Sequence, residues 1–481
     1  MNQFWNKHKA HLFILSVVLL LSSCIEGYDD DWTFNAGVKN TQLESPADTS
    51  IVITKNADGS ELIITWPVIY GAKGYEVSIY NVDDPSNPHA LVDKLFVDGC
   101  STNCEYLDDT KYRFEIRALG NPKYNNKDAE APTIKNHSTL LPAYAIIPTG
   151  TDLYQYFTNN VIPDSTLEVA YELEPNGEYT VSGPVDFQKH WIVLRGDKIY
   201  HPKITYAAAG RISTTSGITI KYINFDLSAV LPTSSDAAVL SFSSTPDPAI
   251  LGTGSYYILK APKSVLIYSC NFNTLNTRLI NDNGKKYCIE NLTVKNCIIP
   301  LGAIPTDGIV FMKGGFINNF YFNNNTIYGT IESGGYFLKY ENSGRPDRAG
   351  FVNATININN NTFYNVVKTG QMANYPGMNK NTVTIKMNKN IFIDCGSNYV
   401  IRRLAISSTN IVKELKDNCY WFAGAFPQVN EVDPSYGDKS GTAFGEDPQF
   451  ADPSNGNFTI GTGATQILEK GCGDPRWLPA N

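Results

Sequence analysis

Charged residues are scarce in this sequence: only 18% of the 481 residues are Asp, Glu, Lys or Arg, where about 25% is usual. Lysine and arginine number 39 against 47 acidic residues, which gives a net charge of −8 at pH 7. No basic run occurs, so the sequence excludes a typical nucleic-acid-binding protein. Only six histidines are present. No Cys-His metal spacing, glycine-rich phosphate loop or Ser-His-Asp order appears, and we predict no metal site and no cofactor.

Long apolar runs are missing except near the N-terminus, where residues 12–21 follow Lys7 and Lys9. A largely apolar stretch of ten residues is too short to span a bilayer, but it suits the core of a signal peptide. They lead into Leu-Ser-Ser-Cys at positions 21–24, which resembles a bacterial lipoprotein box. The resemblance implies cleavage after residue 23 and acylation of Cys24. The loss of two lysines then changes the net charge from −8 to −10.

The mature chain would begin with an acidic tether, residues 24–44, that contains Asp29, Asp30 and Asp31. This acidic stretch behind an acylated cysteine resembles the surface-export signal of Gram-negative lipoproteins, although a solvated linker would have the same composition. We therefore expect an outer-membrane lipoprotein that is exposed on the cell surface, and no nucleic-acid partner.

Strand-forming residues dominate the remainder, with 28 Tyr and 23 Phe among an aromatic content of 12%. Residues 61–66, 74–80 and 109–119 alternate apolar and polar side chains, which predicts short strands of a β-sandwich. The early Trp66, the Gly-Tyr-Glu-Val strand and the late Tyr-x-Phe-x-Ile-x-Ala strand resemble a fibronectin type III domain over residues 45–148. That resemblance implies a spacer or scaffold rather than a catalytic unit.

Nine cysteines occur, and most lie beside apolar strand residues, as small buried core residues do. Cys100 and Cys104 are the exception because they are close together in a predicted loop. They are candidates for a disulfide bond in an oxidising compartment.

After residue 148 short strands recur that each end in Asn, with an apolar or aromatic residue within the next two positions. The successive Asn spacings are 47, 25, 29, 36, 29 and 28 for Asn224, Asn271, Asn296, Asn325, Asn361, Asn390 and Asn418. A nearly constant minimum with occasional excess predicts a solenoid in which surplus residues form loops. We predict that residues 149–425 form a right-handed parallel β-helix of pectate-lyase type in shape, with the last six of these Asn stacked in one line. The fold class is therefore all-β, a fibronectin type III-like sandwich followed by a β-helix.

The segment from 426 to 481 contains Asp-Pro-x-Phe at 447–450 and Gly-x-Phe at 456–458, which resembles the closing segment of secreted β-helix proteins. We expect it to pack on the β-helix. The whole order resembles a group of uncharacterised polysaccharide-utilisation lipoproteins. The resemblance implies a polysaccharide as ligand and outer-membrane glycan transporters as possible partners.

Acidic residues are too sparse and too scattered in the predicted coils for a paired acid and base. Basic residues follow two apolar residues on three coils, at Lys313, Lys339 and Arg402, which predicts one column of cations. Arginine can pair with a carboxylate and tyrosine can stack on a sugar ring. The predicted glycan-binding residues are Arg278, Lys313, Lys339, Tyr340, Arg345, Arg348, Tyr375 and Arg402.

These residues favour binding of an acidic, pectin-like glycan without catalysis. A polysaccharide lyase or glycoside hydrolase on the same fold is the alternative, and Ca²⁺ would be expected only for the lyase. A structural or adhesion protein is the third possibility.

Overall fold

The structure is a computed structural model that describes residues 38–231, 236–302, 307–329, 335–341, 345–367, 371–395, 404, 410–426 and 438–479. Cys24 and Arg402 lie outside these ranges. The chain divides into two compact units, Met1–Leu140 and Leu141–Asn481. Across the described ranges, no helix is both long enough and apolar enough to cross a membrane.

The N-terminal unit contains two antiparallel sheets, which agrees with the predicted sandwich. One sheet has the order β1-β2-β5 and the other β4-β3-β6-β7. The strands are β1 (Val52–Lys55), β2 (Glu61–Thr65), β3 (Ala72–Asn81), β4 (His89–Val97), β5 (Ser101–Glu105), β6 (Lys111–Gly120) and β7 (Thr133–Ser138), with the 3-10 turns η1 (Asp48–Ser50) and η2 (Pro122–Tyr124). Alternate residues of β6 are buried, among them Tyr112, Phe114 and Ile116. They pack with Trp66, whose ring lies edge-on 5.3 Å from that of Tyr75.

The predicted disulfide is wrong, because Cys100 and Cys104 are both free thiols. Strand β5 begins directly after Cys100 and includes Cys104. Four residues of extended chain separate Cα atoms by about 13 Å, whereas a disulfide requires less than about 7 Å. Cys104 faces the sandwich core, and burial raises the pKa of its thiol to about 11.

The C-terminal unit is built from three parallel sheets, here named A, B and C. Sheet A contains β8 (Ala143–Ile147), β9 (Val169–Leu173), β12 (Ile192–Arg195), β15 (Ile218–Lys221), β18 (Tyr257–Leu259), β19 (Val265–Tyr268), β22 (Tyr287–Lys295), β25 (Phe316–Asn323), β28 (Ala354–Asn359), β31 (Val383–Asn388) and β33 (Val412–Lys416). Sheet B contains β10 (Glu178–Val181), β13 (Lys203–Tyr206), β16 (Asn224–Asp226), β20 (Asn271–Phe272), β23 (Ile298–Pro300), β26 (Thr326–Tyr328), β29 (Thr362–Tyr364), β32 (Ile391–Ile393) and β34 (Cys419–Trp421). Sheet C contains β11 (Pro184–Asp186), β14 (Arg211–Thr214), β17 (Ala238–Phe242), β21 (Arg278–Asn281), β24 (Val310–Met312), β27 (Leu338–Tyr340) and β30 (Ala373–Asn374).

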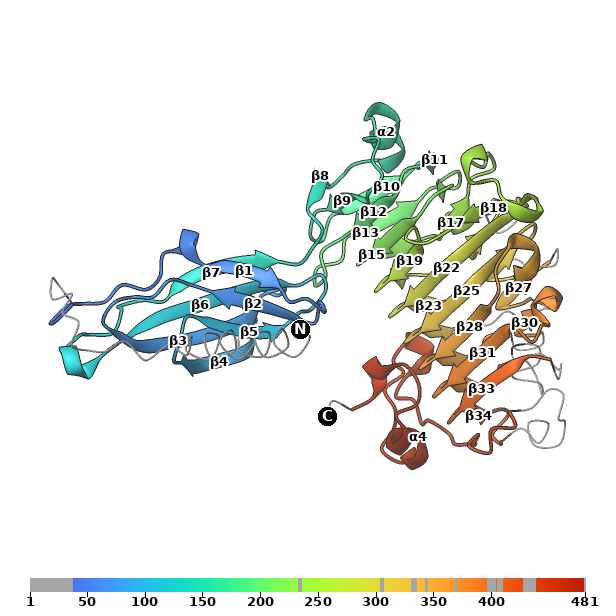
Figure 1. Cartoon of the computed structure of the whole chain (residues 1–481). Coiled ribbons are helices and arrows are strands. Elements are labelled where there is room, and N and C mark those ends of the chain that lie inside the picture. Colours follow the sequence, from blue (N-terminus) through green and yellow to red (C-terminus); the bar gives the residue numbers. More distant parts are fainter. Residues whose placement is uncertain are drawn as a thin grey trace, which may run out of the picture. The chain divides into compact units, whose positions relative to one another are not determined.

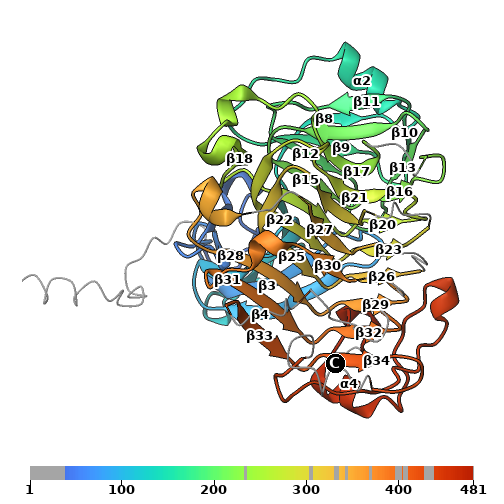
Figure 2. The ribbon, with the colours of Figure 1, turned by 90° about the vertical axis from the view of Figure 1, so that its right-hand side faces the viewer.

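Successive strands visit sheets A, B and C in turn, so each circuit forms one coil of the predicted parallel β-helix. Each strand pairs in parallel with the equivalent strand one coil later, as Phe320 does with Ile356 and Ile356 with Ile385. Figures 1 and 2 show the stacked strands of the three sheets. Parallel connections of this kind are right-handed. The unit begins at Leu141, eight residues before the predicted boundary, because β8 pairs with β9.

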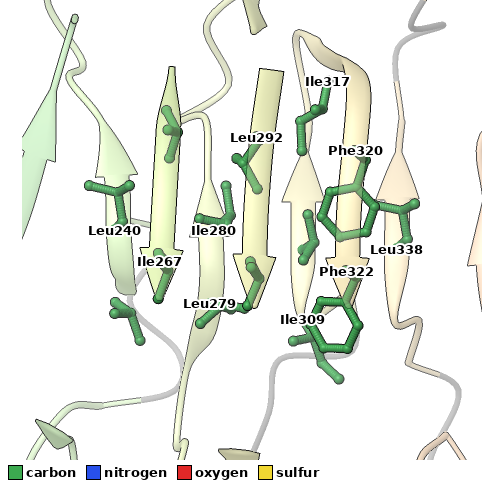
Figure 3. Close-up of a cluster of buried hydrophobic side chains, with 14 of the residues drawn as sticks. Leu240, Ile267, Leu279, Ile280, Leu292, Ile309, Ile317, Phe320, Phe322 and Leu338 are labelled. Carbon is green, nitrogen blue, oxygen red and sulfur yellow. The ribbon is translucent and has the colours of Figure 1, made fainter. Parts of the chain in front are cut away.

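One continuous core fills the β-helix, because alternate residues of every strand point inward. Figure 3 shows aliphatic and aromatic residues of neighbouring coils in contact, including Leu292, Phe320, Phe322 and Leu338. Such stacking gives the coils their stability, since a single coil cannot bury its own apolar face.

The asparagine ladder is confirmed for four of its six predicted members. Asn325, Asn361, Asn390 and Asn418 are all fully buried, and each side-chain Nδ2 in the first three donates to Oδ1 of the next, at 3.1, 2.9 and 2.9 Å. The same oxygens accept the backbone N–H of the preceding member at 2.9–3.1 Å. The ladder ends where Asn418 Nδ2 donates to Asp438 Oδ2 at 3.2 Å.

Asn271 and Asn296 are one residue out of line with this ladder. The positions in register with Asn325 are Cys297 and Cys270, since Asn271 pairs with Ile298 and Ile298 with Thr326. Asn296 instead occupies the left-handed turn position with a φ of 58°, as Asn324 and Asn360 do in their coils. Asparagine tolerates that conformation unusually well. It is therefore favoured both at this left-handed position and at the ladder position that follows it.

The C-terminal segment packs on the β-helix, as predicted, and its contacts are with the last strands of sheet B. Phe444, Ile460 and Ile467 pack against Ile391 and Ile393 of β32. This segment includes η7 (Pro453–Asn455), α4 (Thr465–Lys470) and η8 (Pro475–Trp477). The other short elements of this unit are α2 (Leu153–Asn159), η3 (Pro248–Ile250), η4 (Thr253–Ser255), η5 (Pro346–Ala349) and η6 (Pro376–Met378).

Candidate functional site on the outer face of sheet C

The outer face of sheet C carries a column of mostly polar side chains. Strand pairing aligns Ser213, Ser241, Asn281, Phe311, Lys339 and Asn374 on six successive coils. Their neighbours in sequence, such as Val310 and Leu338, point into the core. The column therefore follows directly from the two-residue alternation of β-strands.

Phe311 belongs to this column, is only 5% exposed and lies between two cations, Arg278 and Lys339. The guanidinium carbon of Arg278 is 5.6 Å from the centre of the Phe311 ring, and Lys339 Nζ is 5.3 Å from it. Lys339 Nζ is also 5.3 Å from the ring of Tyr336. These distances are within the range of cation–π attraction. The structure thus brings together Arg278 and Lys339, two of the predicted binding residues, around an aromatic residue that the prediction omitted.

Each of these two cations has an acidic partner. Asp307 accepts two hydrogen bonds from Arg278, at 3.0 Å from Nε and 2.7 Å from Nη2, and the Arg278 side chain is only 7% exposed. Lys339 Nζ lies 3.5 Å from Glu341. Arg278 therefore acts as a fixed support for Phe311, whereas Lys339 is partly exposed and can exchange its partner for a ligand.

Lys313 does not align with Lys339, contrary to the predicted column. Phe311 is the residue that pairs with Lys339, so Lys313 is level with Glu341 one coil later. The Lys313 side chain is exposed, and its backbone N–H donates to Asp282 Oδ1 at 2.9 Å. The repeated apolar-apolar-basic sequence misled the prediction because its two copies occupy different positions relative to the strand end.

Asp282 fixes the backbone beside Lys313. This fully buried carboxylate accepts N–H bonds from Gly284, Lys313, Gly314 and Gly315 at 2.7–2.9 Å. Burial raises the pKa of Asp282 to about 6, while the four N–H groups favour the ionised form. Through these four bonds Asp282 holds the chain after β24 in place.

The prediction that Tyr340 and Tyr375 lie on the surface is wrong. Tyr340 is fully buried and Tyr375 is 2% exposed. Their rings pack together inside the core with 5.9 Å between the ring centres. Burial raises the pKa of both hydroxyls well above the usual value. Neither ring is available to stack on a sugar, because Tyr340 shares the inward side of β27 with Leu338.

Arg345 and Arg348 lie at η5, in the connection between β27 and β28. Arg348 is exposed, and Arg345 is partly exposed and lies 3.3 Å from Asp347. The carbonyl of Arg348 approaches Gly254 of η4. These two arginines belong to a corner between sheets C and A and not to the Phe311 column. Arg402 lies outside the described residues.

Sequence reasoning missed the polar outer face of sheet A. Strand pairing places Thr293, Tyr321, Asn357 and Lys386 in one column there. The signal was present in the sequence Ile-Asn-Ile-Asn of β28, since its apolar residues are buried and its asparagines face outward. Within the described ranges, no group of three or more His, Cys, Asp or Glu side chains could hold a metal ion.

Comparison with known proteins gives matches to three domains of unknown function. Models of these domains match residues 2–180 (DUF4992), 177–330 (DUF4957) and 356–477 (DUF5123). No curated protein matches the sequence.

Among solved structures, the chain is similar to pectate lyase PelI from Erwinia chrysanthemi in complex with tetragalacturonic acid. The identity is 10%, with 72% of this chain and 84% of that chain covered and a TM-score of 0.20. Pectate lyase Pel3 from Pectobacterium carotovorum is 9% identical, with 84% and 100% covered and a TM-score of 0.16. Scores this low do not bear on substrate or catalysis. The evidence for a parallel β-helix is the pairing of its own strands.

Proposed function

We propose that this protein binds a polysaccharide at the outer face of sheet C and is held at the cell surface by a lipid on Cys24. The observation that carries the proposal is the packing of Phe311 between Arg278 and Lys339, with the exposed Lys313 on the same coil as Phe311. Lys313 lies in the loop after β24, and loops on a rigid scaffold are favourable positions for ligand recognition.

The rigidity of the scaffold supports binding. Arg278 is immobilised by its two bonds to Asp307, and the chain at Lys313 is immobilised by Asp282. Binding to protein groups that are already ordered costs less conformational entropy than binding to groups that must first become ordered.

The ligand in this proposal is an acidic glycan. Lys339 of the column and Lys313, which follows β24, are the nearby cations that retain exposed surface, and a carboxylate of the glycan would replace Glu341 beside Lys339. Charge-assisted hydrogen bonds of this kind contribute about 1.5–3 kcal/mol each. The mature net charge of −10 opposes an acidic ligand over long range, but screening limits that repulsion to roughly 8 Å at physiological salt.

The anchor and the partners rest on the sequence of the N-terminal region. Acylation at Cys24 would retain the protein on the outer membrane, and the N-terminal sandwich would act as a spacer. Outer-membrane glycan transporters are the proposed recipients of the captured polysaccharide.

The test is binding of polygalacturonate to the mature protein and to a Lys313→Gln, Lys339→Gln double variant, measured by calorimetry. The affinity should fall about tenfold or more in the variant, because each charged hydrogen bond contributes more than 1.4 kcal/mol, and it should fall with added salt in the wild type. Lys203→Gln, an exposed lysine of sheet B, is the matched control. Equal affinity of the double variant and the control would refute the site.

The same experiment separates binding from catalysis. Release of unsaturated, ultraviolet-absorbing products by the wild type and not by the double variant would replace the binding proposal with a polysaccharide lyase. No binding of any polysaccharide would leave a structural or adhesion role.

A further inference from the structure

Sheet A carries a second surface that the site on sheet C does not use. Its outward residues on β22, β25, β28 and β31 form three parallel columns that are partly exposed along their whole length. The columns are Asn291-Asn319-Thr355-Thr384, Thr293-Tyr321-Asn357-Lys386 and Lys295-Asn323-Asn359-Asn388.

Tyr321 is the centre of this surface. Thr293 and Asn357 flank it on the adjacent coils, and Asn319 and Asn323 flank it on its own strand. Its neighbours Phe320 and Phe322 are fully buried, so the backbone that carries Tyr321 is fixed by the core. In the described part of the chain, the Tyr321 side chain has neither a ring contact nor a hydrogen bond. Its ring and hydroxyl are therefore available to a ligand.

The surrounding amides are held in place by one another. Asn319 Nδ2 donates to Asn291 Oδ1 at 3.1 Å. Asn323 Oδ1 accepts the backbone N–H of Asn359 at 3.0 Å, and Asn359 Oδ1 accepts that of Asn388 at 2.9 Å. Asn359 Nδ2 also donates to Asn357 Oδ1, and Asn318 Nδ2 lies 3.5 Å from Asn319 Oδ1. These bonds fix the amides and leave Asn323 Nδ2 and Asn357 Nδ2 without a hydrogen bond to the described residues. A rigid array of amides around an aromatic ring is suited to recognise hydroxyl groups, because both amides and hydroxyls donate and accept.

The charges near Tyr321 favour an uncharged partner. Lys386 and Glu414 neutralise each other at a distance of 2.7 Å. Among the residues of the three columns that lie next to Tyr321, Lys295 is the single cation. Every other one is Asn or Thr. The amide groups also recur from coil to coil at the strand spacing of about 4.8 Å. A repeating polymer with hydroxyl groups in each unit matches that recurrence.

We infer that the outer face of sheet A, centred on Tyr321, is a second carbohydrate site that binds an uncharged polysaccharide lying across the coils. The Tyr321 ring stacks on a sugar ring, and Asn319, Asn323 and Asn357 exchange hydrogen bonds with its hydroxyl groups. This site is separate from the one proposed on sheet C and does not depend on it.

The test uses Tyr321→Thr, because threonine favours strands and stands at the neighbouring position 293. The mature wild type, this variant and Tyr144→Thr are compared by affinity electrophoresis in gels that contain galactomannan, arabinoxylan, hydroxyethyl cellulose or polygalacturonate. Tyr144 is the matched control, since it is 60% exposed on β8 of the same sheet. The Lys313→Gln, Lys339→Gln variant is run beside them, and thermal unfolding confirms that each variant is folded.

We expect at least one neutral polysaccharide to bind the wild type and to lose about tenfold in affinity in Tyr321→Thr, which corresponds to about 1.4 kcal/mol. Tyr144→Thr and the lysine variant should bind it normally, and Tyr321→Thr should retain its binding of polygalacturonate. The inference is overturned if the wild type binds no neutral polysaccharide. It is equally overturned if Tyr321→Thr binds the neutral chain as well as the wild type does, or if the lysine variant loses that binding instead. Should Tyr321→Thr not fold, Asn357→Ala replaces it with the same expected outcome.

Discussion

Replacing Asn361 with alanine should destabilise the β-helix more than any exposed asparagine substitution. Asn361 makes five side-chain hydrogen bonds. Its two Nδ2 hydrogens are shared among three acceptors, the carbonyls of Phe322 and Asn359 and Asn390 Oδ1, at 2.7, 2.9 and 2.9 Å. Its Oδ1 accepts the backbone N–H and the Nδ2 of Asn325, at 2.9 and 3.1 Å. All of this lies out of contact with water.

The magnitude follows from the groups that the substitution leaves without these partners. The carbonyl of Asn359 retains the N–H of Asn324, and Asn325 Nδ2 retains the carbonyl of Val294. The N–H of Asn325 and the carbonyl of Phe322 lose the bonds that Asn361 supplies. At about 1–3 kcal/mol for each unsatisfied buried group, Asn361→Ala should cost about 2–6 kcal/mol in free energy of unfolding.

Hydrogen–deuterium exchange followed by mass spectrometry can measure this loss in the protein expressed without residues 1–23. A loss of about 4 kcal/mol would lower protection by roughly a thousandfold if exchange follows opening of the coils. Peptides that cover β26 and β29 should show the change, while peptides of the N-terminal sandwich should not.

Asn357→Ala, on the outer face of the adjacent strand β28, is the control and should change stability by less than about 0.5 kcal/mol. If Asn361→Ala and Asn357→Ala differ by less than about 1 kcal/mol, within the spread of ordinary surface effects, the ladder does not stabilise the coils in the way argued here.

Three further predictions concern single groups. Asp282→Asn should destabilise the protein by about 2–4 kcal/mol in urea unfolding, because its amide N–H₂ would face backbone donors that the carboxylate now accepts; an unchanged midpoint would refute this role. Iodoacetamide should label Cys100 before the buried thiols, since burial raises the pKa of Cys104 to about 11 and of Cys395 to about 12; failure to label Cys100 and Cys104 after unfolding without reductant would reveal a disulfide. Cys24→Ala should abolish fatty-acid labelling and release the protein from membranes, and retention without label would show a different anchor.

The coil repeat could be predicted because one position of the turn accepts very few residue types. Asn325, Asn361, Asn390 and Asn418 each occupy a buried position that requires both donors and an acceptor. The error at Asn271 and Asn296 arose because adjacent positions of the same turn also favour asparagine. Cys297 occupies the ladder position of its coil with a weaker hydrogen bond, because its thiol lies 3.9 Å from the carbonyl oxygen of Ile267.

The candidate site was harder to predict because it depends on register within sheet C. Strand alternation alone would have placed Tyr340 inward beside Leu338 and Lys339 outward. The contact of Phe311 with Arg278 and Lys339 required knowledge of which residue lies level with which across coils. The connections between coils vary in length, so the sequence does not fix that register.

The buried asparagines also give the β-helix a dipole along its axis. Each amide from Asn325 to Asn418 donates one N–H to the next group toward the C-terminal end, so the dipoles of these bonds add along the axis with the positive end at Asn418. That end meets the carboxylate of Asp438, which also accepts the hydroxyl of Tyr420 at 2.9 Å. A carboxylate cannot donate onward, so it closes the chain of amides where a further asparagine would prolong it. The C-terminal end of this ladder is thereby set by a single acidic residue from outside the repeat.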